Sequence, residues 1–199
     1  MNKLIQTSIA PFFVRMTHWL NAIAVLIMIM SGLKIYNASP IFDFMIPKAF
    51  PLGGWLGGAL LWHFAFMWLL VANGLIYLIL NFATGRMRKK FFPIKPKEFF
   101  QDVLATIKGK LSHDDLSQYN TIQKLAYLSI MIDIVILVMS GLVIWKPVQF
   151  PLLRELMGDF DNARIIHFFA MVYAVFFCVV HLVMVALVPK TLLIMIRGK

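Results

Sequence analysis

Residues 163–188 read ARIIHFFAMVYAVFFCVVHLVMVALV, and Arg164 is their only Lys, Arg, Asp or Glu. Crossing the hydrocarbon core of a bilayer takes about 20 mostly apolar residues in one helix. A helix of this length is about 39 Å long, which is more than enough. The stretch is therefore predicted to span a membrane.

Three further apolar stretches qualify by the same criterion, at about 12–36, 55–82 and 122–145. The whole chain of 199 residues is 61% hydrophobic and 14% charged, whereas soluble domains are about 25% charged. These values exclude a soluble enzyme and a disordered chain, and the single Cys178 excludes an intrachain disulfide framework. The sequence predicts an all-α integral membrane four-helix bundle, a single domain over residues 1–199.

The formal charge of +10 is distributed unevenly. Fourteen of the 19 Lys and Arg residues lie in or next to the two terminal segments and the connection between the second and third spans, and five lie in or next to the other two connections. Positive loops stay in the cytoplasm, so both termini and the connection 85–120 are predicted to be cytoplasmic in a bacterial inner membrane. The excess charge then marks topology, and no nucleic-acid partner is expected.

The connection 85–120 carries apolar residues at helical spacing within the segment 97–111, namely Phe100, Val103, Leu104, Ile107 and Leu111. This pattern predicts an amphipathic helix on the anionic surface of the lipid bilayer. A solvated basic linker is the alternative.

Four of the five histidines lie inside predicted spans, where ionisable groups usually mark function. His18 lies seven residues after Pro11, and His181 lies eight residues before Pro189. His63 and His167 lie at similar depths from the opposite ends of their spans. The four therefore form two layers, with His18 and His181 near the cytoplasm and His63 and His167 near the periplasm.

His167 and His181 are 14 residues apart in one span, so they share a helix face about 21 Å apart along its axis. Two imidazoles leave a tetrahedral zinc site incomplete, but they complete the axial coordination of a haem iron. Two stacked haem groups are predicted, one held by His18 and His181 and the other by His63 and His167. A metal transporter that uses the histidines as relay ligands is an alternative of another class, and it predicts a colourless protein.

Each of two arginines precedes a predicted ligand by three residues, Arg15 before His18 and Arg164 before His167. Arginine can pair with haem propionates at the membrane edge, and Lys146 is a further candidate. Snorkelling to the interface is the alternative for both arginines. Small residues in the spans would let a flat macrocycle approach the backbone, or would serve helix contacts; they are Gly32, Gly74, Ser140 and Gly141.

The stretch PFFVRMTHWLN at residues 11–21 resembles the opening of the bacterial cytochrome b-561 and nickel-iron-hydrogenase b-type cytochrome family. The stretch SGLVIWKPVQ at 140–149 resembles the branch that accompanies periplasmic molybdopterin oxidoreductases. The resemblance implies two haem b groups, exchange with ubiquinone or menaquinone, and a role in anchoring a redox complex. It also suggests a quinone near the cytoplasmic haem, with Arg15, His18 and Asn21 as candidates.

The resulting interpretation is a membrane cytochrome that transfers electrons between the quinone pool and a periplasmic oxidoreductase subunit. The sequence leaves the direction of flow open. The resemblance also offers a stand-alone superoxide:quinone oxidoreductase. Asp133, the lone acid inside the third span, is a candidate for quinone protonation or for a hydrogen bond between helices.

Overall fold

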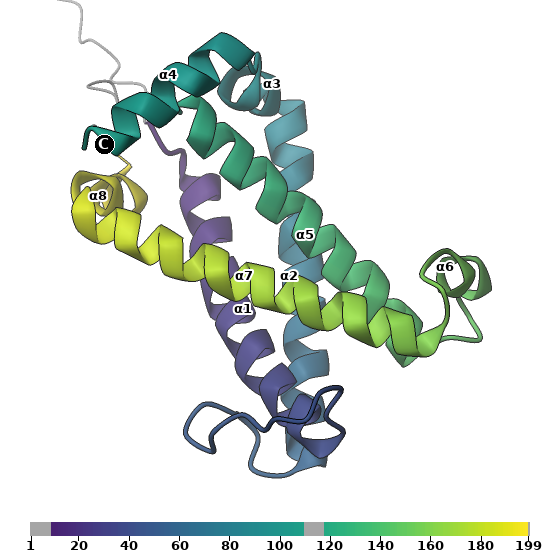
Figure 1. Ribbon diagram of the computed structural model, residues 1–199. Coiled ribbons are helices and arrows are strands. Elements are labelled where there is room, and N and C mark those ends of the chain that lie inside the picture. Colours follow the sequence, from purple (N-terminus) through teal and green to yellow (C-terminus); the bar gives the residue numbers. More distant parts are fainter. Residues whose placement is uncertain (1–8, 110–117, 199) are drawn as a thin grey trace, which may run out of the picture.

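The computed structural model describes residues 9–109 and 118–198, and within them it is all-helical. Four helices are long and apolar enough to cross a membrane: α1 (Phe12–Ala38), α2 (Leu56–Ala83), α5 (Thr121–Trp145) and α7 (Phe160–Leu187). Their ends lie within three residues of those predicted. The predicted class, an all-α four-helix membrane protein, is confirmed (Figure 1).

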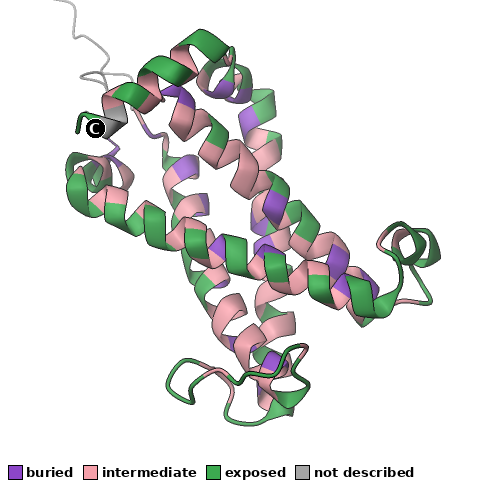
Figure 2. Ribbon diagram, viewed as in Figure 1, coloured by how far each residue is buried: buried purple, intermediate pink, exposed green. Residues whose placement is uncertain are grey.

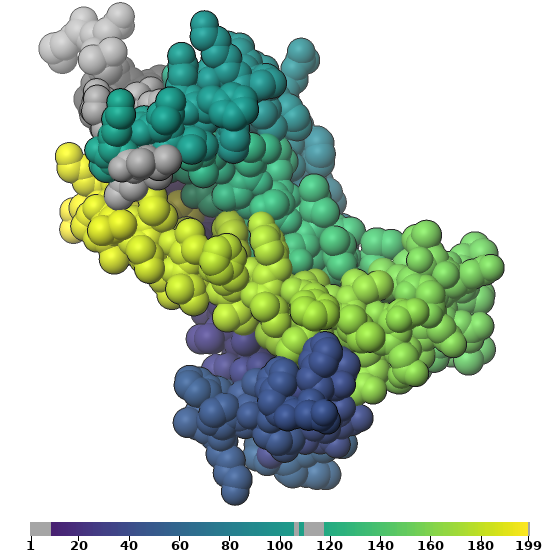
Figure 3. Space-filling model, viewed as in Figure 1, coloured from purple at the N-terminus to yellow at the C-terminus, as the bar shows by residue number. Residues whose placement is uncertain are grey.

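The long helices pack as two pairs, α1 along α2 and α5 along α7. One end of the bundle carries α3 (Arg86–Phe91), α4 (Pro96–Ile107) and α8 (Lys190–Arg197). The opposite end carries the 39–55 connection and α6 (Pro151–Leu156), which project as separate lobes (Figure 3). The two pairs cross, and they diverge toward this second end (Figure 1).

The surface of the bundle is apolar, as a lipid-facing surface must be. Large side chains such as Leu61 (73% exposed) and Trp68 (61% exposed) point outward, and exposed and half-buried residues dominate the helices (Figure 2). The most buried apolar residues are small, including Ala24, Ala59 and Ala163. Small residues allow close approach of membrane helices, and polar side chains such as Ser31 and Ser140 are buried beside them.

The described part of the connection between α2 and α5 contains two short helices, α3 and α4. α4 ends at Ile107 rather than continuing to Leu111, which lies outside the described residues. Phe100 and Leu104 are exposed on it, as an amphipathic helix on a lipid surface requires. Asp102 on α4 accepts a 2.6 Å hydrogen bond from the backbone N–H of Thr121. α4 is therefore tied to the start of α5, whose N-terminus is also closed by a capping box of Asn120 and Gln123.

Candidate functional site

The four intramembrane histidines face one another in two pairs. The ring centroids of His18 on α1 and His181 on α7 are 6.0 Å apart, with an interplanar angle of 62°. Those of His63 on α2 and His167 on α7 are 6.4 Å apart, with an angle of 63°. The structure therefore brings together the same partners that the depth pattern predicts, and α7 contributes one ring to each pair.

The separations fit two imidazoles on one metal ion between them. Two metal–nitrogen bonds of about 2 Å, plus about 1 Å from each nitrogen to its ring centre, give about 6 Å. Among the described residues, no three His, Cys, Asp or Glu side chains gather as a metal site. A donor set of two imidazoles suits an ion whose other ligands come from a macrocycle. The residues present therefore fit an axially ligated haem at each level.

Serine hydroxyls orient the rings of the His63–His167 pair. Ser31 Oγ lies 3.0 Å from His63 Nδ1 and 2.7 Å from the carbonyl oxygen of Ile27. Two oxygens this close need a proton between them, so the hydroxyl donates to the carbonyl and accepts from Nδ1–H. Ser140 repeats the arrangement, 2.9 Å from His167 Nδ1 and 2.7 Å from a helix carbonyl. Both histidines are left with Nε2 as the free electron-pair donor.

Two of the predicted small residues lie directly against these rings. A Cβ on Gly32 would lie 3.5 Å from His63 Cε1, and one on Gly141 would lie 3.4 Å from His167 Cε1. Gly74, the third predicted glycine, has no such neighbour within 4 Å. The sequence carries a signal for these two contacts, because the tetrapeptide MSGL occurs at both 30–33 and 139–142.

Each of the two predicted arginines donates a hydrogen bond from one guanidinium nitrogen to a main-chain carbonyl. Arg15 Nη1 donates to the carbonyl of Ile196 at 2.7 Å, and Arg164 Nη2 donates to that of Ser39 at 2.6 Å. Arg15 Nε is buried and has no partner among the described residues. An orphaned guanidinium N–H suits a carboxylate, so Arg15 retains a donor for a propionate. Lys146 lies over the Trp145 ring, 5.1 Å from its centroid.

Asn21 is engaged by a residue that the sequence did not point to. Asn73 on α2, only 4% exposed, donates from Nδ2 to Asn21 Oδ1 at 2.7 Å and to the carbonyl of Thr17 at 2.8 Å. This contact joins α2 to the turn of α1 that carries His18. Asn73 belongs to no sequence motif, so its partner emerges only from the packing of the helices.

The His18–His181 pair has an aromatic surrounding instead of hydroxyls. Phe177 stacks on His181 with centroids 6.0 Å apart and an angle of 6°. Tyr127 meets Phe177 edge-on, and Tyr119 meets Tyr127 in turn. Burial raises the pKa of the Tyr119 hydroxyl, and the nearby Arg86 guanidinium opposes part of that rise. A row of aromatic rings therefore leads from the loop before α5 to the histidine pair.

Asp133 lies inside α5, seven residues before Ser140 and on the same helix face. It is 6% exposed, and its Oδ2 has no partner among the described residues. Seven residues correspond to about 10 Å along the helix. Along the helix axis, Asp133 thus lies at a depth between the levels of the two histidine pairs.

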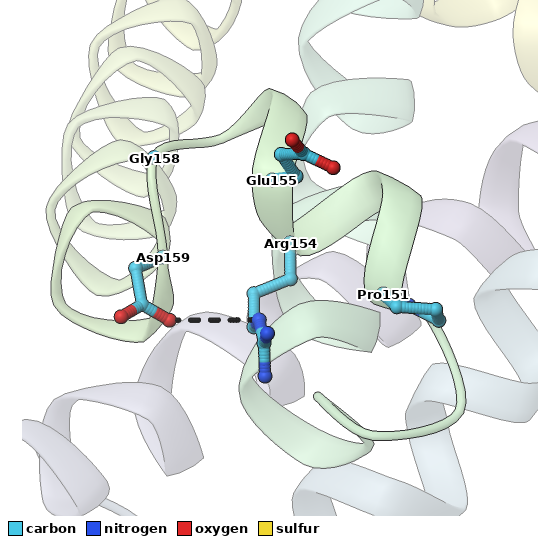
Figure 4. Close-up of a pocket in the computed structure, with 5 residues that line it drawn as sticks. All are labelled: Pro151, Arg154, Glu155, Gly158 and Asp159. Atoms are coloured by element: carbon cyan, nitrogen blue, oxygen red, sulfur yellow. Dashed lines mark ion pairs between the residues drawn. The ribbon is translucent and has the colours of Figure 1, made fainter.

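A surface hollow at the other end of α5 and α7 is separate from the histidines. It is lined by Pro151, Arg154, Glu155, Gly158 and Asp159 (Figure 4). Arg154 and Asp159 form an ion pair of 3.7 Å across it. The hollow is open and contains none of the predicted ligands, so the candidate site remains the two histidine pairs.

Comparison with known proteins agrees with this geometry. Residues 10–198 match the family model described as prokaryotic cytochrome b561. A protein of Azospira oryzae, named "putative protein-methionine-sulfoxide reductase subunit YedZ1", is 57% identical over 191 residues, 96% of either chain. The match covers all four long helices and both histidine pairs. The chain therefore belongs to the prokaryotic cytochrome b561 family, whose members bind haem b.

Proposed function

We propose that this protein is a di-haem cytochrome b that carries electrons across the membrane between quinone and a periplasmic oxidoreductase. The observation that carries the proposal is the pair of facing imidazoles at each of two levels, 6.0 and 6.4 Å apart. When bound, haem b supplies a one-electron carrier at each level. Two levels about 21 Å apart along α7 cover most of the hydrocarbon thickness.

The named relative suggests both the partner and the direction of flow. Its name makes it a subunit of a protein-methionine-sulfoxide reductase, and 57% identity supports the same role here. Reducing one sulfoxide to a sulfide and water consumes two electrons and two protons. Electrons would therefore come from a membrane quinol and reach a soluble catalytic subunit in the periplasm. Haem held by His18 and His181, and haem held by His63 and His167, would supply the carriers between these two ends.

The charge distribution supports a cytoplasmic location for both termini and for α3, α4 and α8. The basic residues concentrate there, as the positive-inside rule requires. The quinone site belongs beside the His18–His181 pair, where Arg15 and Asn21 are the candidates. Arg15 Nε, Arg164 and Lys146 are the candidates for haem propionates.

The decisive experiment is a reduced-minus-oxidised absorbance spectrum of the purified protein with a pyridine haemochrome count. We expect two haem b per chain. A colourless protein would contradict the proposal and favour the metal transporter, and one haem per chain would contradict the two-level arrangement.

A second assay separates the electron-transfer subunit from a stand-alone superoxide:quinone oxidoreductase. The isolated protein is given superoxide and a quinone analogue, and quinone reduction is followed. A subunit that depends on a periplasmic partner shows no superoxide-driven reduction. The Arg154–Asp159 ion pair, which neutralises a basic group at that end, is in keeping with this outcome.

A further inference from the structure

We propose that Ser31 and Ser140 are positioning residues that lower the reduction potential of the haem at the His63–His167 level relative to the other haem. The inference rests on the proposed di-haem function. It concerns the hydrogen bonds behind the ligands rather than the ligands themselves, and it distinguishes two levels that have the same pair of imidazoles.

In the hydrogen bonds at this level the serines are the acceptors and the histidine rings are the donors. Each serine gives its only proton to a carbonyl of its own helix, at 2.7 Å, and so offers the ring nitrogen a lone pair. The contacts to His63 Nδ1 and His167 Nδ1 are 3.0 and 2.9 Å. Both serines are fully buried at 0% exposure, so bulk water does not compete for these nitrogens.

The serine–histidine contact occurs twice at this level. Ser31 on α1 serves a histidine of α2, and Ser140 on α5 serves a histidine of α7, within the two closely packed helix pairs. In both cases the next residue is a glycine, and a Cβ added there would be in van der Waals contact with the histidine ring. α1 and α5 thus each contact a histidine ring through a serine and the glycine that follows it, and both rings belong to the His63–His167 level.

The His18–His181 level differs from the His63–His167 level in the neighbours of its rings. Within the part of the chain that the structure describes, neither the His18 ring nor the His181 ring makes a hydrogen bond. The rings beside them are aromatic, Trp19 against His18 and Phe177 against His181. The two rings of one level are therefore hydrogen-bonded at Nδ1, and those of the other are held by packing.

A hydrogen-bond acceptor beside Nδ1 increases the donor strength of a metal-bound imidazole. Drawing the Nδ1 proton outward raises the electron density on the ring and makes Nε2 a stronger donor. A stronger donor stabilises ferric over ferrous iron, and hydrogen bonding around axial ligands is one of the means by which proteins set haem potentials. The level with two serine acceptors is therefore the lower in potential.

The test is a redox titration of the purified holoprotein, followed in the haem absorbance bands, for Ser31→Ala and Ser140→Ala. We expect each variant to raise the potential of one haem only. The reduced-to-oxidised ratio of that haem at fixed potential should rise about tenfold, which is 59 mV for a one-electron couple. Ser31→Thr and Ser140→Thr, which keep the hydroxyl, should restore the original value.

Ser129→Ala is the matched control, because Ser129 is an α5 serine that bonds a helix carbonyl and Tyr173 but no histidine. It should leave both potentials unchanged. If an alanine variant loses haem, Ser31→Cys and Ser140→Cys keep the side-chain shape with a much weaker acceptor and should shift the same haem in the same direction. Equal shifts of both haems, a downward shift or no shift would overturn the inference, whereas failure to bind haem in the unaltered protein would overturn the proposed function.

Discussion

Arg164 on α7 donates a 2.6 Å hydrogen bond from Nη2 to the main-chain carbonyl of Ser39, just beyond the end of α1. At the opposite end of the bundle, Arg15 on α1 donates to the carbonyl of Ile196 on α8, the helix that follows α7. Each arginine lies three residues before a histidine of the site. The segments that carry His18, His167 and His181 are thus joined at both ends.

Arg164→Gln should lower the free energy of unfolding by about 1 kcal/mol, since a charged donor is lost at a partly exposed site. Both haems should be retained, because the ligands are untouched. Denaturant unfolding in detergent, followed by circular dichroism, measures the change. Arg197→Gln is the control, as Arg197 is an exposed arginine of α8; an equal effect there would show that charge alone is responsible.

Alanine substitutions of the histidines should remove haem in pairs. His63→Ala and His167→Ala should lose the same haem, and His18→Ala and His181→Ala should lose the other, because the rings face each other in that pairing. Haem content and the potential of the remaining haem identify which level is lost. His113→Ala serves as the control from the connection. Loss of the same haem in the His18 and His63 variants would refute the pairing.

Gly141→Leu should remove the haem of the His63–His167 level. A Cβ at Gly141 would already be in van der Waals contact with His167 Cε1, at 3.4 Å, so the further carbons of a leucine are expected to displace the ring. Gly74→Leu is the matched substitution in another span, where nothing lies within 4 Å of the added Cβ, and it should retain both haems. The measurement is the haemochrome count, and equal haem loss in both variants would contradict the steric explanation.

Asn73→Ala should loosen the contact between α1 and α2. Two hydrogen bonds to α1 are lost, and bonds between membrane helices are worth about 0.6 kcal/mol each, so about 1 kcal/mol is expected. Thermal unfolding in detergent provides the readout. Asn81→Ala is the comparison, because Asn81 is equally buried but bonds only a carbonyl of its own helix. A larger effect at Asn81 would contradict the role given to Asn73.

The features that the sequence predicts well depend on one helix at a time. The four spans follow from long apolar runs, and the proximity of His18 to His181 follows from depth alone once the topology is assigned. The spacing of His167 and His181 likewise needs only the helix repeat. These predictions use no knowledge of how one helix is rotated against another.

The features that the sequence does not predict depend on that rotation. Asn73 meets Asn21 because α2 turns one particular face to α1, and the arginines find carbonyls that belong to other segments. The short helices α3, α6 and α8 escape prediction because six to eight residues carry too little periodicity. The serine contacts are intermediate, since the MSGL repeat is visible in the sequence but its histidine partners are not.

α7 carries one ring of each pair on a single unbroken helix. In the proposed di-haem arrangement, the distance between the two levels would therefore be set by covalent geometry, 14 residues at about 1.5 Å each, and not by the loops or by the docking of a partner. Tunnelling rates fall exponentially with distance, so the spacing of the two histidines along α7 would set the rate of electron transfer. One residue inserted between His167 and His181 would rotate one ring by about 100° away from its partner. Insertions in the connections would leave this spacing unchanged.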